Sequence, residues 1–250
     1  MSTKAIKGDS MSPDGKRSDI VLHELEHYRQ RFHWDCGVSC VLMVLPGRQR
    51  RQLLDNFAAT CQEEGFNQST WTIDLCYLLK RFNIKHSMYT TLLGVNENHR
   101  SQGYYEKIID LDRERVCRRF ASAAAAGLSV TLAAVSMAEL MAHVRSRGPA
   151  IVLVDAGLLV CDLCKHNKLR VEFRRWLGGS YRGHYVVVTG ETEHRVLYRD
   201  PGAAAPLCAA RRRALQRARA APGTDLDTVL LFDVEGGRPQ TPHTTDIRIH

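Results

Sequence analysis

The sequence predicts an α+β domain in which N-terminal helices pack on a mainly antiparallel sheet. Predicted helices come first along the chain and most predicted strands come last. The strand–helix alternation that builds parallel sheets is therefore weak. The composition is that of a globular chain, with 44% hydrophobic and 25% charged residues, and it excludes collagen-like, coiled-coil and wholly disordered classes.

One domain is expected over residues 21–235, because no repeat or long linker divides the 250-residue chain. The polar segments 1–20 and 236–250 are predicted to be disordered tails. A chain of this length can bury a core without a metal or disulfide. Its eight cysteines fall far below the density of disulfide-rich secreted modules.

Caps and apolar stripes predict the helices. The predicted helices cover residues 36–45, 50–63, 104–126, a segment that begins at Trp71, and a segment that follows Ser136. Thr72 is the expected N-cap of the helix at Trp71. Ser136 and Glu139 have the spacing of a capping box, in which each side chain bonds the backbone N–H of the other residue.

Short apolar and β-branched runs predict the strands. They cover residues 84–90, 128–135, 150–154, 185–189, 195–198 and 229–232. The run 150–154 is continuously apolar and is expected to be a buried central strand, with the helices on one side of the sheet.

Charge and hydropathy favour neither nucleic-acid binding nor membrane binding. The net charge is +8, but the arginine clusters in 48–51 and 211–219 have helical apolar spacing and are interpreted as solvated helix faces. The charge-free stretch 120–138 is weakly hydrophobic and is interrupted by Gly127. The first twenty residues contain no apolar run, so a cytoplasmic or nucleocytoplasmic protein is expected.

Cys36 is the candidate nucleophile. A cysteine at the start of a helix meets unpaired backbone N–H groups and the positive end of the helix dipole, which favours the thiolate. Gly37 would allow the backbone to approach closely behind the sulfur. The alternative is a buried structural cysteine.

His184 and Asp200 are the candidate base and its orienting carboxylate. If the strands on either side of residue 192 form a regular hairpin, residues 184 and 200 lie opposite each other, with Cβ atoms ~5 Å apart. A bulge at Gly190 would change this register. The alternative is a surface hairpin in which the two residues are incidental.

Together these residues would form a Cys-His-Asp arrangement suited to nucleophilic catalysis. Gln30, six positions before Cys36, could join the Cys36 backbone N–H as a second oxyanion donor. The candidate cleft residues are Trp34, Asp35, Gly37, Gly183 and Tyr185.

These motifs resemble those of papain-like C39 peptidases. The pattern is Gln30-x5-Cys36-Gly37, then Gly183-His184-Tyr185, then Asp200-Pro201. More narrowly, the chain is similar to the guanylyl-cyclase-domain-containing protein family, named after a plant protein credited with making cyclic GMP. The matching stretches, which run in order over residues 21–233, are 33–37, 71–75, 93–95, 150–154, 161–164 and 183–184.

The resemblance implies a C39-like fold and assigns the catalytic positions to Cys36, His184, Asp200 and Gln30. It departs after Cys164, where relatives are rich in cysteine and this chain reads Lys-His-Asn-Lys-Leu. Any metal or disulfide that the family holds there is not carried over to this chain.

Cys161 and Cys164, with His166, have the spacing of half a zinc site. No second Cys-x-x-Cys motif follows, and Cys208 is the nearest downstream cysteine. Reduced loop cysteines are the favoured interpretation, with a zinc site and a redox pair as alternatives. Neither a metal nor a cofactor is therefore predicted.

Three functions follow as hypotheses. The first is a thiol hydrolase or acyl-transferase that acts on a peptide or amide. The second is a guanylyl cyclase, which rests on the family resemblance alone, because the chain has no G-x-x-x-x-G-K-[ST] motif and no GTP site can be derived. The third is a non-catalytic protein that binds a partner in the cleft.

Overall fold

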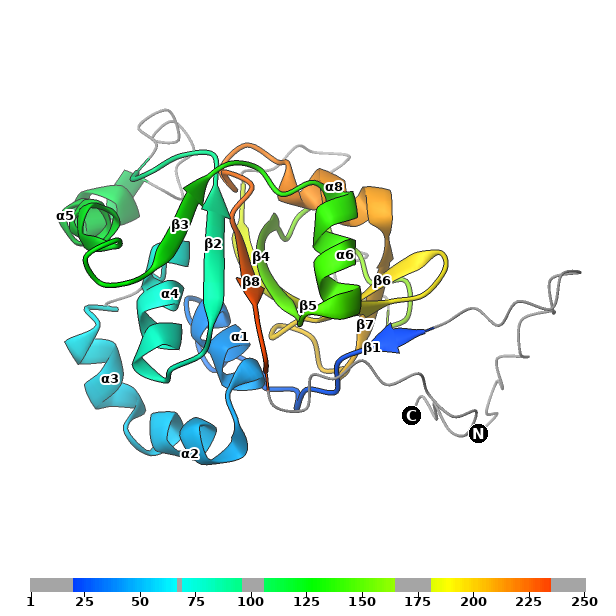
Figure 1. Ribbon diagram of the computed structural model, residues 1–250, viewed down its shortest axis with the longest axis horizontal. Coiled ribbons are helices and arrows are strands. Elements are labelled where there is room, and N and C mark those ends of the chain that lie inside the picture. Colours follow the sequence, from blue (N-terminus) through cyan, green and yellow to red (C-terminus); the bar gives the residue numbers. More distant parts are fainter. Residues whose placement is uncertain (1–19, 67–68, 96–105, 165–180, 235–250) are drawn as a thin grey trace, which may run out of the picture.

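The computed structural model describes residues 20–66, 69–95, 106–164 and 181–234 (Figure 1). The predicted tails at 1–20 and 236–250 lie outside this part of the chain, apart from residue 20. The described residues form a mixed α/β domain around one mostly antiparallel sheet. None of the helices in these ranges is long and apolar enough to cross a membrane.

The sheet has the strand order β3-β2-β8-β4-β5-β6-β7, and β1 pairs with β5. The strands are β1 Val21–Leu22, β2 His86–Thr90, β3 Ser129–Leu132, β4 Ala150–Asp155, β5 Gly183–Glu191, β6 Arg195–Arg199, β7 Cys208–Arg211 and β8 Thr228–Leu231. Only the β2–β3 pairing is parallel among these ladders. Strands β1 and β7 are not among the predicted strands, because both are short and carry little alternation.

The helices are α1 Cys36–Val44, α2 Gly47–Asp55, α3 Phe57–Glu63, α4 Thr72–Arg81, α5 Glu106–Ser122, α6 Met137–Ser146 and α8 Arg212–Arg219. The expected helix 50–63 is divided at Asn56 into α2 and α3. The capping box before α6 is confirmed, with Ser136 Oγ accepting from the Glu139 N–H at 3.2 Å and Glu139 Oε2 accepting from the Ser136 N–H at 2.8 Å.

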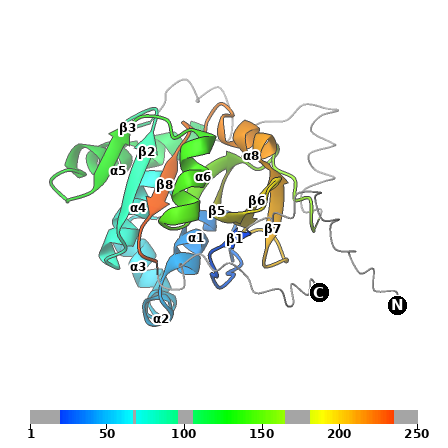
Figure 2. The same ribbon diagram turned by 45° about the vertical axis from the view of Figure 1, so that its right-hand side comes forward.

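The expectation that the helices lie on one side of the sheet is wrong. One apolar cluster joins α1, α4 and the Ile151 and Leu153 side of β4. A second cluster joins α6, α8 and the Val152 and Val154 side (Figures 1 and 2). The physical reason lies in β4 itself, because a continuously apolar strand must be covered on both faces. Every residue of β4 is buried.

The N-cap prediction for α4 is also wrong, because Trp71 occupies the cap position and Thr72 is already helical. The Asp74 carboxylate accepts the Trp71 backbone N–H at 2.9 Å. Asp74 also pairs with Arg115 and Arg119 of α5. Burial raises the pKa of Asp74, while the two arginines oppose this shift. Asp74 therefore fixes both the start of α4 and the docking of α5.

Gly190 belongs to β5 and pairs with both β1 and β6. Between Val188 and Gly190 the β5–β6 register shifts by one residue, which is a β-bulge. On its other side Gly190 pairs with Leu22 of β1, and a Cβ on Gly190 would lie 2.1 Å from the Val21 carbonyl oxygen. Only glycine allows this close approach.

We expect Gly190→Ala to lower the free energy of unfolding by about 3 kcal/mol, because the new methyl overpacks a backbone contact. Gly47→Ala is the matched control, since a Cβ there would meet nothing closer than Arg51 Nη1 at 3.9 Å. Urea unfolding followed by circular dichroism measures both variants. Equal stabilities for the two would contradict the close approach at Gly190.

Candidate functional site

Cys36 is the first residue of α1, and Asp35 holds the loop that leads into it. The Asp35 carboxylate accepts the backbone N–H groups of Arg31 at 3.1 Å and Phe32 at 3.0 Å. Burial raises the pKa of Asp35, and these hydrogen bonds oppose the shift. Asp35, expected as a cleft residue, is instead buried and directed onto its own loop, so it sets where Cys36 emerges.

His184 and Asp200 meet, but in a different register from the expected one. The β5–β6 ladder pairs Val187 with Arg199 and Val188 with Tyr198, so that its extension sets Asp200 opposite Val186, not His184. The expected direct pairing is therefore wrong by two residues, because the turn is centred between Glu193 and His194 and not at residue 192. The bulge at Gly190 moves the register one residue in the opposite direction. Residues two apart on a strand share a face, and the two side chains meet diagonally. His184 Nε2 lies 2.7 Å from Asp200 Oδ1.

Asp200 is itself firmly held. It is 2% exposed, and its Oδ1 atom also accepts the backbone N–H of Gly202 at 2.8 Å. A carboxylate fixed by the turn that follows it can orient an imidazole without moving.

The Cys36 thiol lies near enough to the His184 imidazole to shift its pKa. Burial by itself would lower the pKa of His184. The Asp200 charge and hydrogen bond, together with the hydrogen bond and charge of Cys36, outweigh burial and raise this pKa to about 10. The imidazole thus has a carboxylate and a sulfur as partners, and both favour its protonated form.

Gln30 contacts the turn that follows Asp200 and so lies near the His184–Asp200 pair. Its backbone N–H donates to the Pro201 carbonyl at 3.0 Å. A Cβ built on Gly202 would lie 3.5 Å from Gln30 Oε1 and 3.6 Å from His184 Cε1. Gln30 Nε2 donates to the Phe32 carbonyl at 2.7 Å, which uses one of its two amide hydrogens.

A pocket opens beside Cys36. Of the expected cleft residues, Trp34, Gly183 and Tyr185 line it, whereas Asp35 and Gly37 do not. The other lining residues are His33, Ser69, Thr70, Trp71, Leu153, Gly223, Asp225 and Asp227. A Cβ on Gly37 would lie 2.9 Å from Leu75 Cδ2, so this glycine permits α1 to pack against α4.

Asp227 precedes β8 in the sequence and lines the pocket. It is not among the residues predicted for the site. The Thr72 hydroxyl donates to Asp227 Oδ2 and lies 2.9 Å from the Tyr185 hydroxyl. Asp227 Oδ1 is buried and has no hydrogen-bond partner among the described residues. Burial, with a further contribution from the Asp225 charge, raises the pKa of Asp227 to about 7. The only local signal was a pair of aspartates, Asp225 and Asp227, in the turn before a strand.

The structure brings three cysteines together away from this pocket. Cys208, the first residue of β7, lies beside Cys161 and Cys164 of the loop that follows β4. His166, the other half-site residue of the sequence analysis, lies outside the described residues.

The comparisons with known proteins show the family of this chain. A family model described as guanylylate cyclase matches residues 25–231. A curated relative, guanylyl cyclase 1 of Arabidopsis thaliana, is 32% identical over 241 residues, which cover 93% of this chain and 85% of the relative.

Among solved structures, one described as a C39-like peptidase from Bacillus anthracis is 18% identical, with a TM-score of 0.28. The alignment covers 42% of this chain and 49% of that chain, about half its length. The family model, in contrast, spans most of the chain, and the expected family resemblance is confirmed. The chain belongs to the guanylylate cyclase family.

Proposed function

We propose that this protein is a thiol hydrolase or acyl-transferase that acts on a peptide or amide through Cys36, His184 and Asp200, on a papain-like fold of the C39 kind. One observation carries the proposal. A single imidazole interacts both with a buried carboxylate, at 2.7 Å, and with the sulfur of a cysteine at the start of a helix. This is the arrangement that nucleophilic thiol catalysis requires.

The chemistry follows from these contacts. The Cys36 sulfur attacks the substrate carbonyl carbon, and the carbonyl electron pair moves onto oxygen. The His184 imidazolium then donates its proton to the leaving nitrogen as the C–N bond breaks, which leaves an acyl group on sulfur. Neutral His184 next accepts a proton from water, or from another nucleophile, as that molecule attacks the thioester and releases Cys36.

Asp200 and Gln30 support this cycle in different ways. Asp200 keeps the imidazole in one orientation and stabilises its charge. The oxyanion would be stabilised by the Cys36 backbone N–H, which belongs to the unpaired donors of the first helical turn. The second amide hydrogen of Gln30 would provide the other donor.

The residues that line the pocket would fit a substrate with both apolar and polar groups. Trp34, Trp71 and Leu153 provide an apolar surface, and Trp34 stacks on Phe32 with ring centroids 5.8 Å apart. The Asp227 carboxyl offers an oxygen that lacks a partner among the described residues. A peptide segment that presents both an apolar side chain and N–H donors would satisfy these surfaces.

We expect a small thiol reagent such as iodoacetamide to label Cys36 at pH 6 roughly tenfold or more faster than Cys117, because the proposed pairing with His184 activates the Cys36 sulfur. Cys117 is an exposed cysteine outside the site. The advantage should persist from pH 6 to 9, since the pKa of His184 is about 10 and its imidazolium remains present throughout this range. Mass spectrometry of the labelled peptides gives both rates.

His184→Ala and Asp200→Asn should reduce labelling at pH 6 by about the same tenfold. His194→Ala is the matched control, because His194 is 80% exposed in the β5–β6 turn. Equal rates at Cys36 and Cys117 at every pH would refute the thiol chemistry and favour a non-catalytic protein that binds a partner in the cleft.

A guanylyl cyclase is the second candidate, favoured by the family to which the chain belongs and by the name of its relative from Arabidopsis. GTP would arrive with Mg²⁺, which prefers carboxylate oxygens. Asp225 and Asp227 line one pocket, and the unpartnered Oδ1 of Asp227 fits such an ion. Among the described lining residues none is a lysine or arginine, so these residues provide neither of the side chains that usually hold phosphates.

If this second candidate is right, Cys36→Ala protein should still form cyclic GMP from Mg-GTP, whereas Asp227→Asn should lose most of the product. The rate should rise as the pH passes through about 7, where Asp227 loses its proton and can bind the ion. Asp233→Asn is the control, because Asp233 is 77% exposed and pairs with Lys85 on the surface. Absence of cyclic GMP from the wild-type protein would eliminate this candidate.

A further inference from the structure

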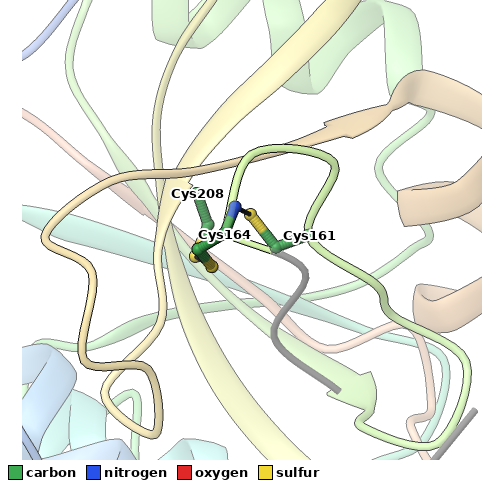
Figure 3. Close-up of side chains that lie close together, drawn as sticks. All are labelled: Cys161, Cys164 and Cys208. Atoms are coloured by element: carbon green, nitrogen blue, oxygen red, sulfur yellow. Dashed lines mark hydrogen bonds between the residues drawn. The ribbon is translucent and has the colours of Figure 1, made fainter. Parts of the chain in front are cut away.

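Three cysteine side chains converge at the edge of the sheet (Figure 3). Cys161 and Cys164 belong to the loop after β4, and Cys208 begins β7, more than forty residues later. Their three sulfur atoms all lie within 4.8 Å of one another, and the Cys164 and Cys208 sulfurs are 3.7 Å apart. Cys161 and Cys208 are buried, whereas Cys164 is exposed.

The Cys164–Cys208 separation of 3.7 Å matches a tetrahedral metal site, and the other two sulfur pairs lie within 4.8 Å. With zinc–sulfur bonds of about 2.3 Å, two sulfurs on a tetrahedral ion are about 3.8 Å apart. A disulfide needs sulfurs about 2.05 Å apart and would use two of the three cysteines. The cluster is therefore close in size to a three-thiolate site.

The backbone around Cys161 supplies a second, independent observation. Two N–H groups point at its sulfur, from Cys164 at 3.3 Å and from Ala209 at 3.4 Å. Backbone N–H groups stabilise a thiolate better than a neutral thiol, and hydrogen bonds of this kind orient metal-bound ligands. One donor follows Cys161 by three residues and the other lies on β7, so both segments are already shaped around the sulfur.

We propose that Cys161, Cys164 and Cys208 bind a zinc ion. Soft thiolates select thiophilic metals, and zinc needs no redox partner and accepts a tetrahedral site. A solvent molecule completes the tetrahedron. The assignment does not depend on the proposed function, because its ligands are separate from Cys36, His184 and Asp200.

The ion would fasten together two segments that border the candidate site. The Cys161 loop follows β4, whose last residue, Asp155, pairs with Gly183 next to His184. The Cys208 segment continues from Asp200 through the turn. The Asp162 N–H already donates to the Ala209 carbonyl at 2.7 Å, and zinc would make this junction rigid.

The test uses the full chain, purified without chelator and with reductant present. We expect close to one zinc ion per chain by elemental mass spectrometry. Exchange for cobalt should give the thiolate-to-cobalt charge-transfer band and the visible bands of a tetrahedral ion. Cys161→Ser and Cys208→Ser should lose most of the bound metal, whereas Cys117→Ser, which removes an exposed cysteine of α5, should keep it.

Metal binding by the wild-type chain decides the matter even if a serine variant fails to fold. Titration of metal-free protein with cobalt, followed by displacement with zinc, should saturate at one equivalent and raise the midpoint of thermal unfolding. Substoichiometric zinc together with no charge-transfer band would overturn the proposal. A Cys164–Cys208 disulfide found by peptide mapping of protein purified under the same conditions would also overturn it.

Discussion

The antiparallel pairing of β4 with β5 is the constraint on which the rest of the structure depends. Its register runs from Ala150 opposite Val188 to Asp155 opposite Gly183, and both faces of β4 are buried. A strand pair with two apolar faces is stable only when helices cover both. The sheet then extends outward, with β8 added to β4 and β6 added to β5. His184 lies within this pair, opposite Val154, so the candidate base is carried by an inner strand of the sheet.

The candidate site depends on how three chain segments are attached to β5. The helix α1 brings Cys36, the β6 strand and its following turn bring Asp200, and the segment before α1 brings Gln30. The Gln30 N–H to Pro201 carbonyl bond joins two of these segments directly. Each of the polar groups involved is held by a neighbour, as when Asp200 accepts the Gly202 N–H. Such support allows a site to keep its geometry while a substrate binds.

Two titratable groups near Cys36 have shifted pKa values of different origin. Asp200 and Cys36 stabilise the protonated form of the His184 imidazole. Burial favours the protonated form of Asp227, which lines the pocket with Cys36. The carboxylate Asp227, rather than the histidine, is the group that titrates near neutrality.

The local sequence pattern predicted most of the helices and strands, because caps and periodicity depend on near neighbours, as the Ser136 capping box illustrates. It also placed Cys36 at the start of a helix and identified the histidine and aspartate that meet. It could not give the β5–β6 register, because the exact position of the turn and the bulge after Val188 together decide which residues pair. The sequence by itself determined which groups are available for chemistry. Only the tertiary structure decided that Asp227 faces the pocket and that Cys208 joins Cys161 and Cys164, because these contacts depend on long-range strand pairing that no local period encodes.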